Sequence, residues 1–488
     1  MIYPEKEEFL KLSEKYEKIT IYKEIFADTL TPVNLLLLLS YCKNLFLLES
    51  TKIDKTFSRF SFLGSNPEKV LIGTRDHVII QKGEDYKKIN KNIIDYINEN
   101  YQEKSQFINE EFGDFAGGLV GFFGYETVNF MNFLRKKIKI SDEIHSIVFE
   151  VNKFFVFDNF KNKLYAAICV DNNVNYFLAL EKLDDFTKKV FKNKKNSSTS
   201  HLPPSTLTIE KEYQDIKFLD KINSIKDEII NGEAIQVVLS RKYTVYGKVN
   251  PFSFYRALRN INPSPYMFFI KFNDKVLAGS SPETHLKVKN RYALLKPIAG
   301  TYPVGKDLEK IKKALLDDEK EISEHLMLLD LARNDLYQGC DINSVKVTTA
   351  FSTEVYSHVI HIVSEVIGRL KNNVTPFQLF LKTFPAGTVS GAPKVRAIEL
   401  ISEYEESTRG FYSGCVGYIN YNHSLDTCIT IRSAFFEKEK TISRAGAGIV
   451  ADSSPENELK EIDRKLKAIF SAINFITQME KNNVFAYW

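Results

Sequence analysis

The chain has 488 residues, of which 44% are hydrophobic and 26% charged, and its net charge of +4 comes from 66 basic and 62 acidic side chains. This length allows two sizeable hydrophobic cores, and the near balance of charge argues against a nucleic-acid-binding protein. Five scattered cysteines without CxxC spacing indicate reduced thiols, not a disulfide framework or a zinc site. The N-terminus is rich in Glu and Lys, and the most apolar runs are shorter than the ~20 residues of a membrane helix. We therefore expect a cytoplasmic protein that does not enter a membrane.

The first 190 residues predict a mixed helical and extended region. Residues 1–30 have the pattern of a helix followed by a strand, and Thr31-Pro32 predicts the start of a short leucine-rich helix. Glycines in the stretch 115–125 favour a tightly packed pair of buried strands, because glycine permits close backbone approach. The other expected elements are strands at 45–50, 59–73 and 77–83, a helix at 87–100 and a hairpin that turns at 159–162.

A polar stretch at 191–205, rich in Lys, Asn, Ser and Pro, predicts an exposed and mobile linker. We therefore expect an N-terminal domain at 1–190, a linker at 191–208 and a second domain at 209–488. Because the chain has no alternating βαβ rhythm and no GxGxxG motif, an α+β fold is favoured over a Rossmann fold. The second part predicts helices at 210–231, 251–260 and 375–382, strands at 234–245, 266–273, 276–279, 284–289, 292–295 and 345–347, and further strands and a helix to 476.

The stretch 317–337 predicts a long helix with one buried face. On this helix Glu321 and Glu324 stand three residues apart, so their carboxylates lie side by side. The apolar residues that define the helical period are Ile322, Leu326, Leu329 and Leu336.

A second helix with the same carboxylate spacing is predicted after Asp452 or Ser453, since either residue suits an N-cap. It carries Glu458 and Glu461. Two such pairs offer oxygens for Mg²⁺, which binds a few carboxylates together with water and substrate oxygens. For either pair alone, a solvated helix face explains the pattern equally well.

Longer motifs in a fixed order across the chain narrow the choice. They are EKEISEHLMLLDLARND at 319–335, SHVIHIVSEV at 357–366, FPAGTVSGAPKVRAIELI at 384–401 and AGAGIVADSSPENE at 445–458, with LLES at 47–50 and NPSPYMFF at 262–269. Together they resemble the chorismate-utilising enzymes, and within that family the large subunits of anthranilate synthases. The resemblance implies large sheets sandwiched between helices, with an interleaved N-terminal regulatory domain.

The resemblance also implies a site for chorismate, a small ring that carries two carboxylates. It assigns Mg²⁺ to Glu324 and Glu461, with Glu321 and Glu458 completing a ring of carboxylates. The implied catalytic residues are His361 as a proton-transfer or electrostatic group near the departing pyruvate, Glu283 as the acid that protonates the leaving hydroxyl, and Thr388. The implied substrate-binding residues are Gly300, Thr301, Tyr412, Arg432, Gly446, Ala447, Gly448 and Lys465.

Taken alone, these residues permit other interpretations. The AGAG at 445–448 suits a nest of backbone N–H groups around an anion, but also a glycine bulge or turn. Arg432 at a strand end suits a carboxylate but also a surface ion pair, and His361 on an apolar strand suits a buried core position. His358 and His361 lack a third ligand at matching spacing for a metal site.

Two positions bear on the nucleophile. Gln236 stands where water-using members of the family carry a lysine, and Ala299 stands where many aminodeoxychorismate synthases carry one. The resemblance therefore implies ammonia as the nucleophile. No cysteine has the setting of an amidotransferase nucleophile, so a separate glutamine amidotransferase subunit and a hetero-oligomer are implied. The alternatives are an aminodeoxychorismate synthase subunit and a catalytically silent tryptophan-binding regulator.

Two further segments imply a tryptophan pocket away from the active site, and with it feedback inhibition by L-tryptophan. Without the resemblance, a buried strand end and a rigid turn explain both segments. The chain also departs from the family at Tyr302 and Val304, where arginines are common. The residues implied for the tryptophan pocket are Glu49, Ser50, Pro265, Tyr266 and Met267.

Overall fold

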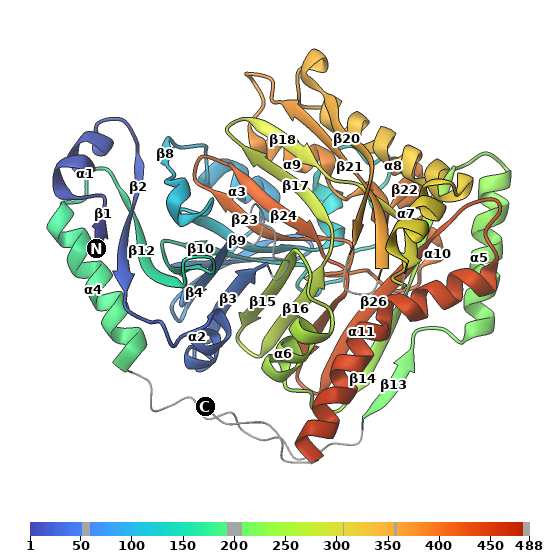
Figure 1. Cartoon of the computed structure of the whole chain (residues 1–488), viewed down its shortest axis with the longest axis horizontal. Helices are drawn as coiled ribbons and strands as arrows, with labels where there is room; N and C mark the ends of the chain where they lie inside the picture. The colour runs from blue at the N-terminus through green and yellow to red at the C-terminus, as the bar shows by residue number, and fades with distance from the viewer. Residues whose placement is uncertain (51–58, 193–206, 306, 356–358, 482–488) are drawn as a thin grey trace.

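A computed structural model of the chain describes residues 1–50, 59–192, 207–305, 307–355 and 359–481. Within these ranges the chain forms two large sheets with helices on their outer sides (Figure 1). All the strand pairs are antiparallel except for one short parallel pair at an edge. The mixture of large antiparallel sheets and separate helices confirms the expected α+β class.

The first sheet joins strands from both ends of the sequence. Its neighbouring strands are, in order, β1 (Ile2–Tyr3), β2 (Lys18–Ile25), β12 (Lys163–Asp171), β11 (Lys153–Asp158), β4 (Phe60–Ser65), β3 (Asn44–Glu49), β15 (Tyr266–Phe272), β16 (Lys275–Ser281), β25 (Ser433–Glu437), β26 (Lys440–Ile449), β14 (Gln236–Tyr246) and β13 (Thr208–Lys211), with β8 (Gln106–Phe107) beside β2 and β22 (Gly391–Ala392) beside β14.

The second sheet is built in the same interleaved way. Its order is β19 (Ile298–Pro303), β21 (Val359–Arg369), β18 (Tyr292–Leu295), β17 (Thr284–Lys289), β24 (Leu425–Ile429), β23 (Cys415–Asn420), β9 (Gly118–Phe123), β10 (Ser146–Val151), β5 (Lys69–Gly73), β6 (Val78–Lys82) and β7 (Asp85–Ile89), with β20 (Lys346–Val355) beside β21. The predicted N-terminal region thus supplies strands to both sheets, through β3 against β15 and β9 against β23.

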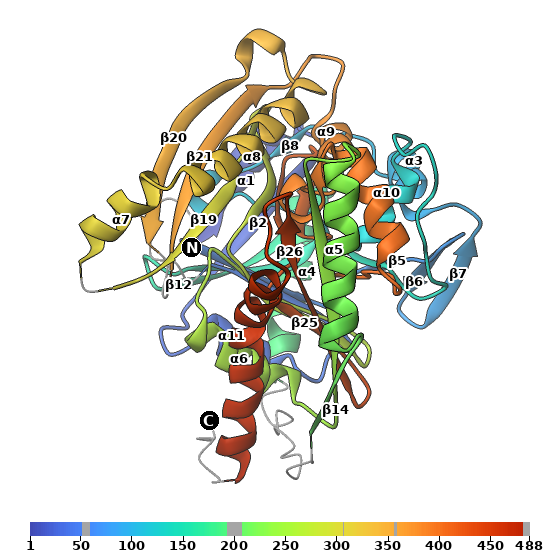
Figure 2. The same ribbon diagram turned by 90° about the vertical axis from the view of Figure 1, so that its right-hand side faces the viewer.

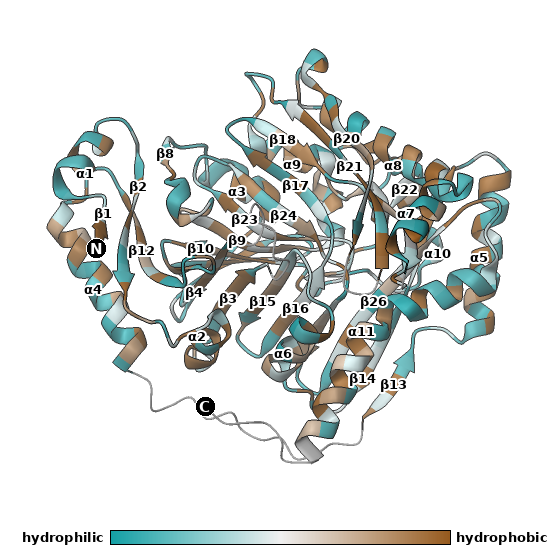
Figure 3. Cartoon of the chain, viewed as in Figure 1, coloured by the Kyte–Doolittle hydropathy of each residue, from teal (hydrophilic) through white to brown (hydrophobic). Residues whose placement is uncertain are grey.

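The helices lie outside the sheets and supply the outer cores. They are α1 (Lys6–Ser13), α2 (Pro32–Leu38), α3 (Ile93–Asn100), α4 (Tyr176–Lys192), α5 (Asp215–Ile230), α6 (Pro251–Ile261), α7 (Leu308–Leu316), α8 (Glu319–Tyr337), α9 (Pro376–Thr383), α10 (Lys394–Tyr404) and α11 (Pro455–Lys481), with short 3₁₀ turns η1 (Glu110–Phe112), η2 (Tyr125–Phe130), η4 (Ile342–Ser344) and η5 (Gly387–Val389). Figure 3 shows apolar and hydrophilic residues interspersed along α4 and α11, as expected for helices with one buried face. No helix among the described residues is both long and apolar enough to cross a membrane.

An aromatic core holds the two sheets together. Phe46 and Phe154 of the first sheet and Phe149 of the second belong to one buried cluster, and Phe115 packs against Phe46, Phe62 and Phe154 within it. Burying an aromatic side chain of this size stabilises the fold by roughly 2–3 kcal/mol. Two further large cores lie outside, one under α2, α4, α6 and α11 and one under α3, α5, α8, α9 and α10, and a small one contains Leu315, Ile360 and Ile362.

Several local predictions are wrong at their boundaries. The predicted helix at 87–100 begins only after Asn92, whose side chain caps α3 by accepting from the Asp95 amide, and residues 85–89 form β7. The predicted helix at 210–231 begins at Asp215, because 208–211 pair with β14. The predicted strand at 345–347 continues to residue 355 against β21.

The predicted strand pair at 115–125 is also wrong, because this stretch forms only β9 followed by η2. Its glycines nevertheless permit close backbone approach: a Cβ on Gly118 would lie 2.2 Å from the carbonyl oxygen of Ile419. The predicted linker at 191–205 overlaps the last residues of α4, and 193–206 lie outside the described residues, as does His358.

Candidate active site

Helices α8 and α11 bring the two carboxylate pairs to one place. The side chain of Asp318 caps α8 by accepting from the amides of Lys320 and Glu321, and the Tyr302 hydroxyl donates to the same carboxylate at 2.9 Å. Tyr302, which replaces an arginine common in the family, therefore ties β19 to the start of α8. In Figure 2 α8 lies alongside β19 and β21, and it packs against both strands.

Two details of these helices differ from the sequence prediction. Leu326 is 47% exposed and does not belong to the buried face, which is formed by Leu328, Leu329, Ala332 and Leu336. Neither Asp452 nor Ser453 is the N-cap of α11, because Pro455 is the first helical residue and the Ser454 carbonyl accepts the first hydrogen bond of the helix. Ser453 instead accepts from the Val450 amide.

The negative charges of these glutamates affect one another's pKa values. Burial raises the pKa of Glu324 to about 7, and the charges of Glu321 and Glu461 add to the rise. Burial and Glu461 likewise raise the pKa of Glu458. Burial also acts to raise the pKa of Glu461, but the ammonium of Lys465, 2.6 Å away, holds it below its ordinary value.

This donor set fits a hard divalent cation. Besides Lys465, the ammonium of Lys320 lowers the pKa values of three of the glutamates, a role that the sequence analysis did not find. With all four carboxylates ionised, the form that a bound cation favours, the two ammonium groups leave a net charge of −2, which a divalent ion neutralises. Among the described residues, no three His, Cys, Asp or Glu side chains are grouped as metal ligands. Mg²⁺ is commonly bound through one or two carboxylates together with water and substrate oxygens.

A bulge in β19 links these carboxylates to His361. The register of β19 against β21 shifts between Ala299 and Thr301, and Gly300 has φ +67°, a left-handed conformation that favours glycine. A Cβ on Gly300 would lie 3.2 Å from a carboxylate oxygen of Glu321. Thr301 lies opposite His361 in the strand pair, but its side chain is outside the described part of the chain.

His361 is held as a neutral imidazole. Its Nδ1 lies 2.8 Å from the carbonyl oxygen of Gly300 and therefore carries the proton, since a carbonyl only accepts. Burial lowers the pKa of His361 to about 4, and the cations Arg432 and Lys465 add to the shift. At neutral pH its Nε2 thus retains a lone pair.

Glu283 and Thr388 line a cavity between β17, α8 and η5. The cavity opens to solvent, and Lys296 and Asp335 also line it. Burial raises the pKa of Glu283 to about 7, while Thr388 and Lys465 oppose the shift. Thr388 Oγ1 is buried, and its hydroxyl opposes the pKa shift because it lies close enough to the Glu283 carboxyl to act as a hydrogen-bond donor.

The remaining predicted substrate contacts gather around the end of β26. Lys465 donates to the carbonyl of Gly446 at 2.8 Å, and a Cβ on Gly446 would lie 3.0 Å from the Tyr412 hydroxyl. Arg432 has φ +51° and a pKa lowered by burial, although the nearby carboxylate of Glu461 opposes that shift. The cluster thus contains the cations that two substrate carboxylates require.

The predicted backbone nest at 445–448 is wrong, because these residues form a regular strand that pairs with β14. Beyond Ser443, β26 has no partner strand on its other side among the described residues. In a strand the carbonyl and amide of one residue point the same way, so the Gly446 and Gly448 amides face the open side, where Lys465 lies. The Ala447 amide points towards β14 instead.

Of the two positions that bear on the nucleophile, Gln236 is close to this strand and Ala299 lies in β19. Gln236 is buried, and a Cβ on Gly448 would lie 2.6 Å from its side-chain nitrogen. Ala299 is buried next to the bulge at Gly300.

The predicted tryptophan segments also lie side by side. Glu49 of β3 is directly opposite Met267 of β15, so their side chains share one face of the sheet. Glu49 is 5% exposed and is already paired with Arg259 at 2.8 Å and with the Tyr255 hydroxyl. Tyr266 and Met267 contribute to different cores on opposite faces of β15, so the prediction that both side chains flank one indole is wrong.

Comparison with known proteins places this site in a class. Residues 45–471 match the family model described as chorismate binding enzyme. The chain belongs to this family of chorismate-binding enzymes.

Within the family, the chain is similar to anthranilate synthase component 1 over nearly its whole length. It is 35% identical to that protein of Acetivibrio thermocellus, covering 97% of this chain and 99% of the relative, and 36% identical to that of Aquifex aeolicus, covering 97% and 98%. The crystal structure of anthranilate synthase component I from Streptococcus pneumoniae matches with a TM-score of 0.74 at 32% identity, over 86% of this chain and 94% of that one. MenF, the menaquinone-specific isochorismate synthase of Escherichia coli, shares the fold with a TM-score of 0.69 at 17% identity.

Proposed function

We propose that this chain is the chorismate-converting subunit of an anthranilate synthase, in the first step of tryptophan biosynthesis. Ammonia adds at C2 of chorismate as the C4 hydroxyl leaves, and elimination of pyruvate then gives aromatic anthranilate. The main observation behind the proposal is a cluster that contains an acid, a neutral imidazole, cations and carboxylates. The acid is Glu283, the imidazole is His361, and the ammonium of Lys465 affects the pKa values of both and of the carboxylates. The similarity to anthranilate synthase component 1 supports the choice of product.

Glu283 serves as the general acid. With its pKa raised to about 7 by burial, a large fraction of Glu283 carries a proton at neutral pH and can protonate the departing hydroxyl. His361 serves in the second step, where its unprotonated Nε2 accepts the ring proton as pyruvate leaves. Thr388 contributes a hydroxyl beside Glu283.

Two groups of donors hold the substrate. Arg432, Tyr412 and the open-edge amides of Gly446 and Gly448 bind the enolpyruvyl carboxylate, and Lys465 adds positive charge beside them. Glu321, Glu324, Glu458 and Glu461 would hold Mg²⁺, directly or through water. When bound, the ion supplies positive charge for the ring carboxylate and draws electron density from the ring.

Ammonia is the proposed nucleophile. The amide of Gln236 has no basic lone pair with which to activate water, and Ala299 offers no amine for covalent attack. Ammonia would come from glutamine through a separate amidotransferase subunit, so the purified chain alone should use ammonium but not glutamine.

Product analysis tests the proposal. Purified chain incubated with chorismate, ammonium and Mg²⁺ should give fluorescent anthranilate and pyruvate. Formation of 4-amino-4-deoxychorismate would instead assign the chain to aminodeoxychorismate synthesis, isochorismate would assign it to water addition, and no product would favour a silent regulator. Glutamine-dependent turnover without a partner would contradict the two-subunit proposal.

A further inference from the structure

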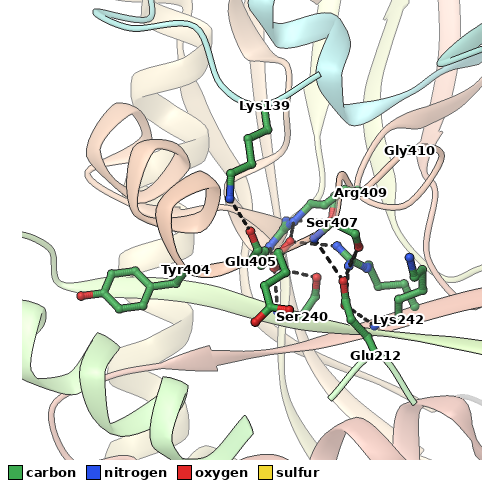
Figure 4. A network of polar contacts seen from close by, with 12 residues as sticks. Lys139, Glu212, Ser240, Lys242, Tyr404, Glu405, Ser407, Arg409 and Gly410 are labelled. Carbon is green, nitrogen blue, oxygen red and sulfur yellow. Dashed lines mark hydrogen bonds and ion pairs between the residues drawn. The ribbon is translucent and has the colours of Figure 1, made fainter. Parts of the chain in front are cut away.

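A buried ionic cluster lies beneath the candidate site, at the junction of α10, β14 and β26 (Figure 4). Its centre is Glu405, which is 3% exposed. One oxygen of Glu405 accepts from the amide and hydroxyl of Ser240 and from Arg409, at 2.7–2.8 Å. The other accepts from Arg409 at 3.0 Å and from Arg444 at 2.9 Å. This carboxylate therefore has a full set of donors.

Arg409 reaches from Glu405 to three chain segments, two that carry predicted substrate contacts and one that pairs with the strand carrying others. One terminal nitrogen donates to the carbonyl of Val389, the residue after Thr388, at 2.7 Å and to the Ser413 hydroxyl at 3.1 Å. The other donates to the carbonyl of Val238 at 2.6 Å. Val238 pairs with Gly448, and Ser413 follows Tyr412.

The guanidinium also lies over the Tyr412 ring, 5.6 Å from its centre. Each of the three segments is thus held by a bond from a single planar, rigid group. A displacement of Arg409 changes the position of η5, of the loop at Tyr412 and of β14 together.

Arg444 extends the cluster to the strand that carries the open-edge glycines. It stands two residues before Gly446 and joins Glu405 to Glu212 at 2.7 Å and to the Ser407 hydroxyl at 2.7 Å. Ser240, which donates to Glu405, lies directly opposite Gly446 in the pairing of β14 with β26. The cluster therefore contacts both strands of this pair.

Stability alone does not account for such a cluster. Removing charges from water costs several kcal/mol per ion, and buried ion networks are often replaced by apolar side chains without loss of stability. A network of fixed hydrogen bonds does, however, define the relative positions of the backbone segments that it joins.

We propose that the cluster of Glu405, Arg409 and Arg444 is a positioning device that sets Thr388, Tyr412 and the Gly446–Gly448 edge at the spacing the substrate requires. These three residues act through others and are not catalytic residues. The inference rests on the proposed function, since it assumes that those groups contact chorismate.

The first test removes one bond of the cluster. Ser413→Ala deletes the hydroxyl that accepts from Arg409, and Ser61→Ala is the matched control, because Ser61 is an equally buried serine that accepts one side-chain N–H bond from Asn159 in a distant part of the first sheet. Both variants should lose a similar amount of thermal stability. Only Ser413→Ala should lower kcat/KM for chorismate, by about tenfold. A loss of activity equal in both variants would reduce the cluster to a structural role.

The second test is Arg409→Lys, which keeps the positive charge beside Glu405 but loses the fork that reaches Val389, Val238 and Ser413. Circular dichroism and the melting temperature establish that it folds, and a folded variant should lose kcat at least tenfold more than it loses chorismate affinity by calorimetry. Wild-type kinetics in folded Arg409→Lys and in Ser413→Ala would overturn the inference. If Arg409→Lys does not fold, Ser240→Ala takes its place.

Failure of the proposed function and failure of the positioning inference give different experimental results. The wild-type product decides the proposed function, whereas the variants are compared with wild type on whatever product chorismate gives. Chorismate affinity measured by calorimetry separates a loss of binding from a loss of turnover in each variant.

Discussion

At the scale of single residues, burial assigns opposite chemical roles to two side chains in one site. Removal from water disfavours the charged form of each, so the pKa of Glu283 rises to about 7 and that of His361 falls to about 4. Near neutral pH the carboxyl therefore holds a proton that it can donate, while the imidazole holds a lone pair that can accept one. An acid and a base then coexist without a strongly acidic or basic medium.

The first prediction concerns pH. Because the pKa of Glu283 is raised, its protonated form is fully present below the ordinary carboxyl value and is lost as pH rises through about 7. At constant free ammonia, kcat should fall above that pH, approaching a tenfold loss per unit. Glu283→Gln should lower kcat by ~10²–10⁴ and abolish this limb of the profile. Anthranilate fluorescence between pH 6 and 9 measures both, and an unchanged limb in the variant would reject Glu283 as the acid.

The second prediction concerns His361→Asn. The asparagine amide can still donate to the Gly300 carbonyl, but it has no basic nitrogen in place of Nε2. Elimination of pyruvate should slow more than amination, so an aminated, non-aromatic intermediate should accumulate in single-turnover samples analysed by mass spectrometry. Equal slowing of both steps, with no intermediate, would contradict a proton-accepting role.

At the scale of elements, the sequence predicts best what repeats along the chain. Helix α8 and strands β17 and β18 lie where the apolar period puts them, and the capping residue Asp318 stands next to the predicted start at 317. Helical period alone does not reveal which apolar residues a neighbouring strand covers, so it predicts Leu326 on the buried face, whereas this residue is exposed. The choice depends on how α8 packs against β19 and β21, which its own helical period does not contain.

Backbone irregularities could not be predicted from the sequence for a related reason. AGAG at 445–448 has the composition of a turn but pairs with β14, because ten residues of register with that strand outweigh local glycine preference. The bulge at Gly300 arises only where β19 meets β21. Arg409 and Glu405 are four residues apart like a surface pair, and nothing local indicates that β14 and β26 bury them.

The third prediction concerns the carboxylates that α8 and α11 bring together. Glu324→Gln keeps the shape of the side chain but removes a charge from the cluster, so activity at limiting Mg²⁺ should fall at least tenfold and the Mg²⁺ requirement should rise. Glu461→Gln should act similarly, although it also breaks the pair with Lys465. Glu319→Gln is the control, since Glu319 is exposed in the first turn of α8. Variants that match the control across a Mg²⁺ titration would refute the metal assignment.

At the scale of the whole molecule, the pairing of β3 with β15 connects the predicted tryptophan segments to the active site. Strand β3, from before residue 191, pairs with β15, from after residue 208, and the two lie side by side in Figure 1. From β15 the Tyr266 hydroxyl reaches Asp426 and Thr284, each at 2.9 Å. Thr284 follows Glu283 and lines the same cavity. A change in the pairing of β3 with β15 can therefore be transmitted to Glu283 through Tyr266 and Thr284.

The last prediction is feedback inhibition. Ser50 Oγ is buried beside Glu49 with no hydrogen-bond partner among the described residues, so it is available to a ligand such as the α-amino group of tryptophan. Glu49 already has Arg259 as its counter-ion, and an added ammonium must share or displace that pair, which gives binding a means of shifting β3 against α6. Tryptophan should inhibit by favouring a state that binds chorismate poorly, and chorismate should weaken tryptophan binding by the same factor.

Ser50→Phe tests this prediction, because the phenyl ring should fill the pocket and relieve inhibition while ammonia-dependent activity stays within about twofold of wild type. Calorimetric titration of tryptophan with and without chorismate measures the coupling from both directions. Wild-type activity that millimolar tryptophan does not lower would contradict the feedback proposal. That result would also favour synthesis of 4-amino-4-deoxychorismate, an alternative that product analysis tests independently.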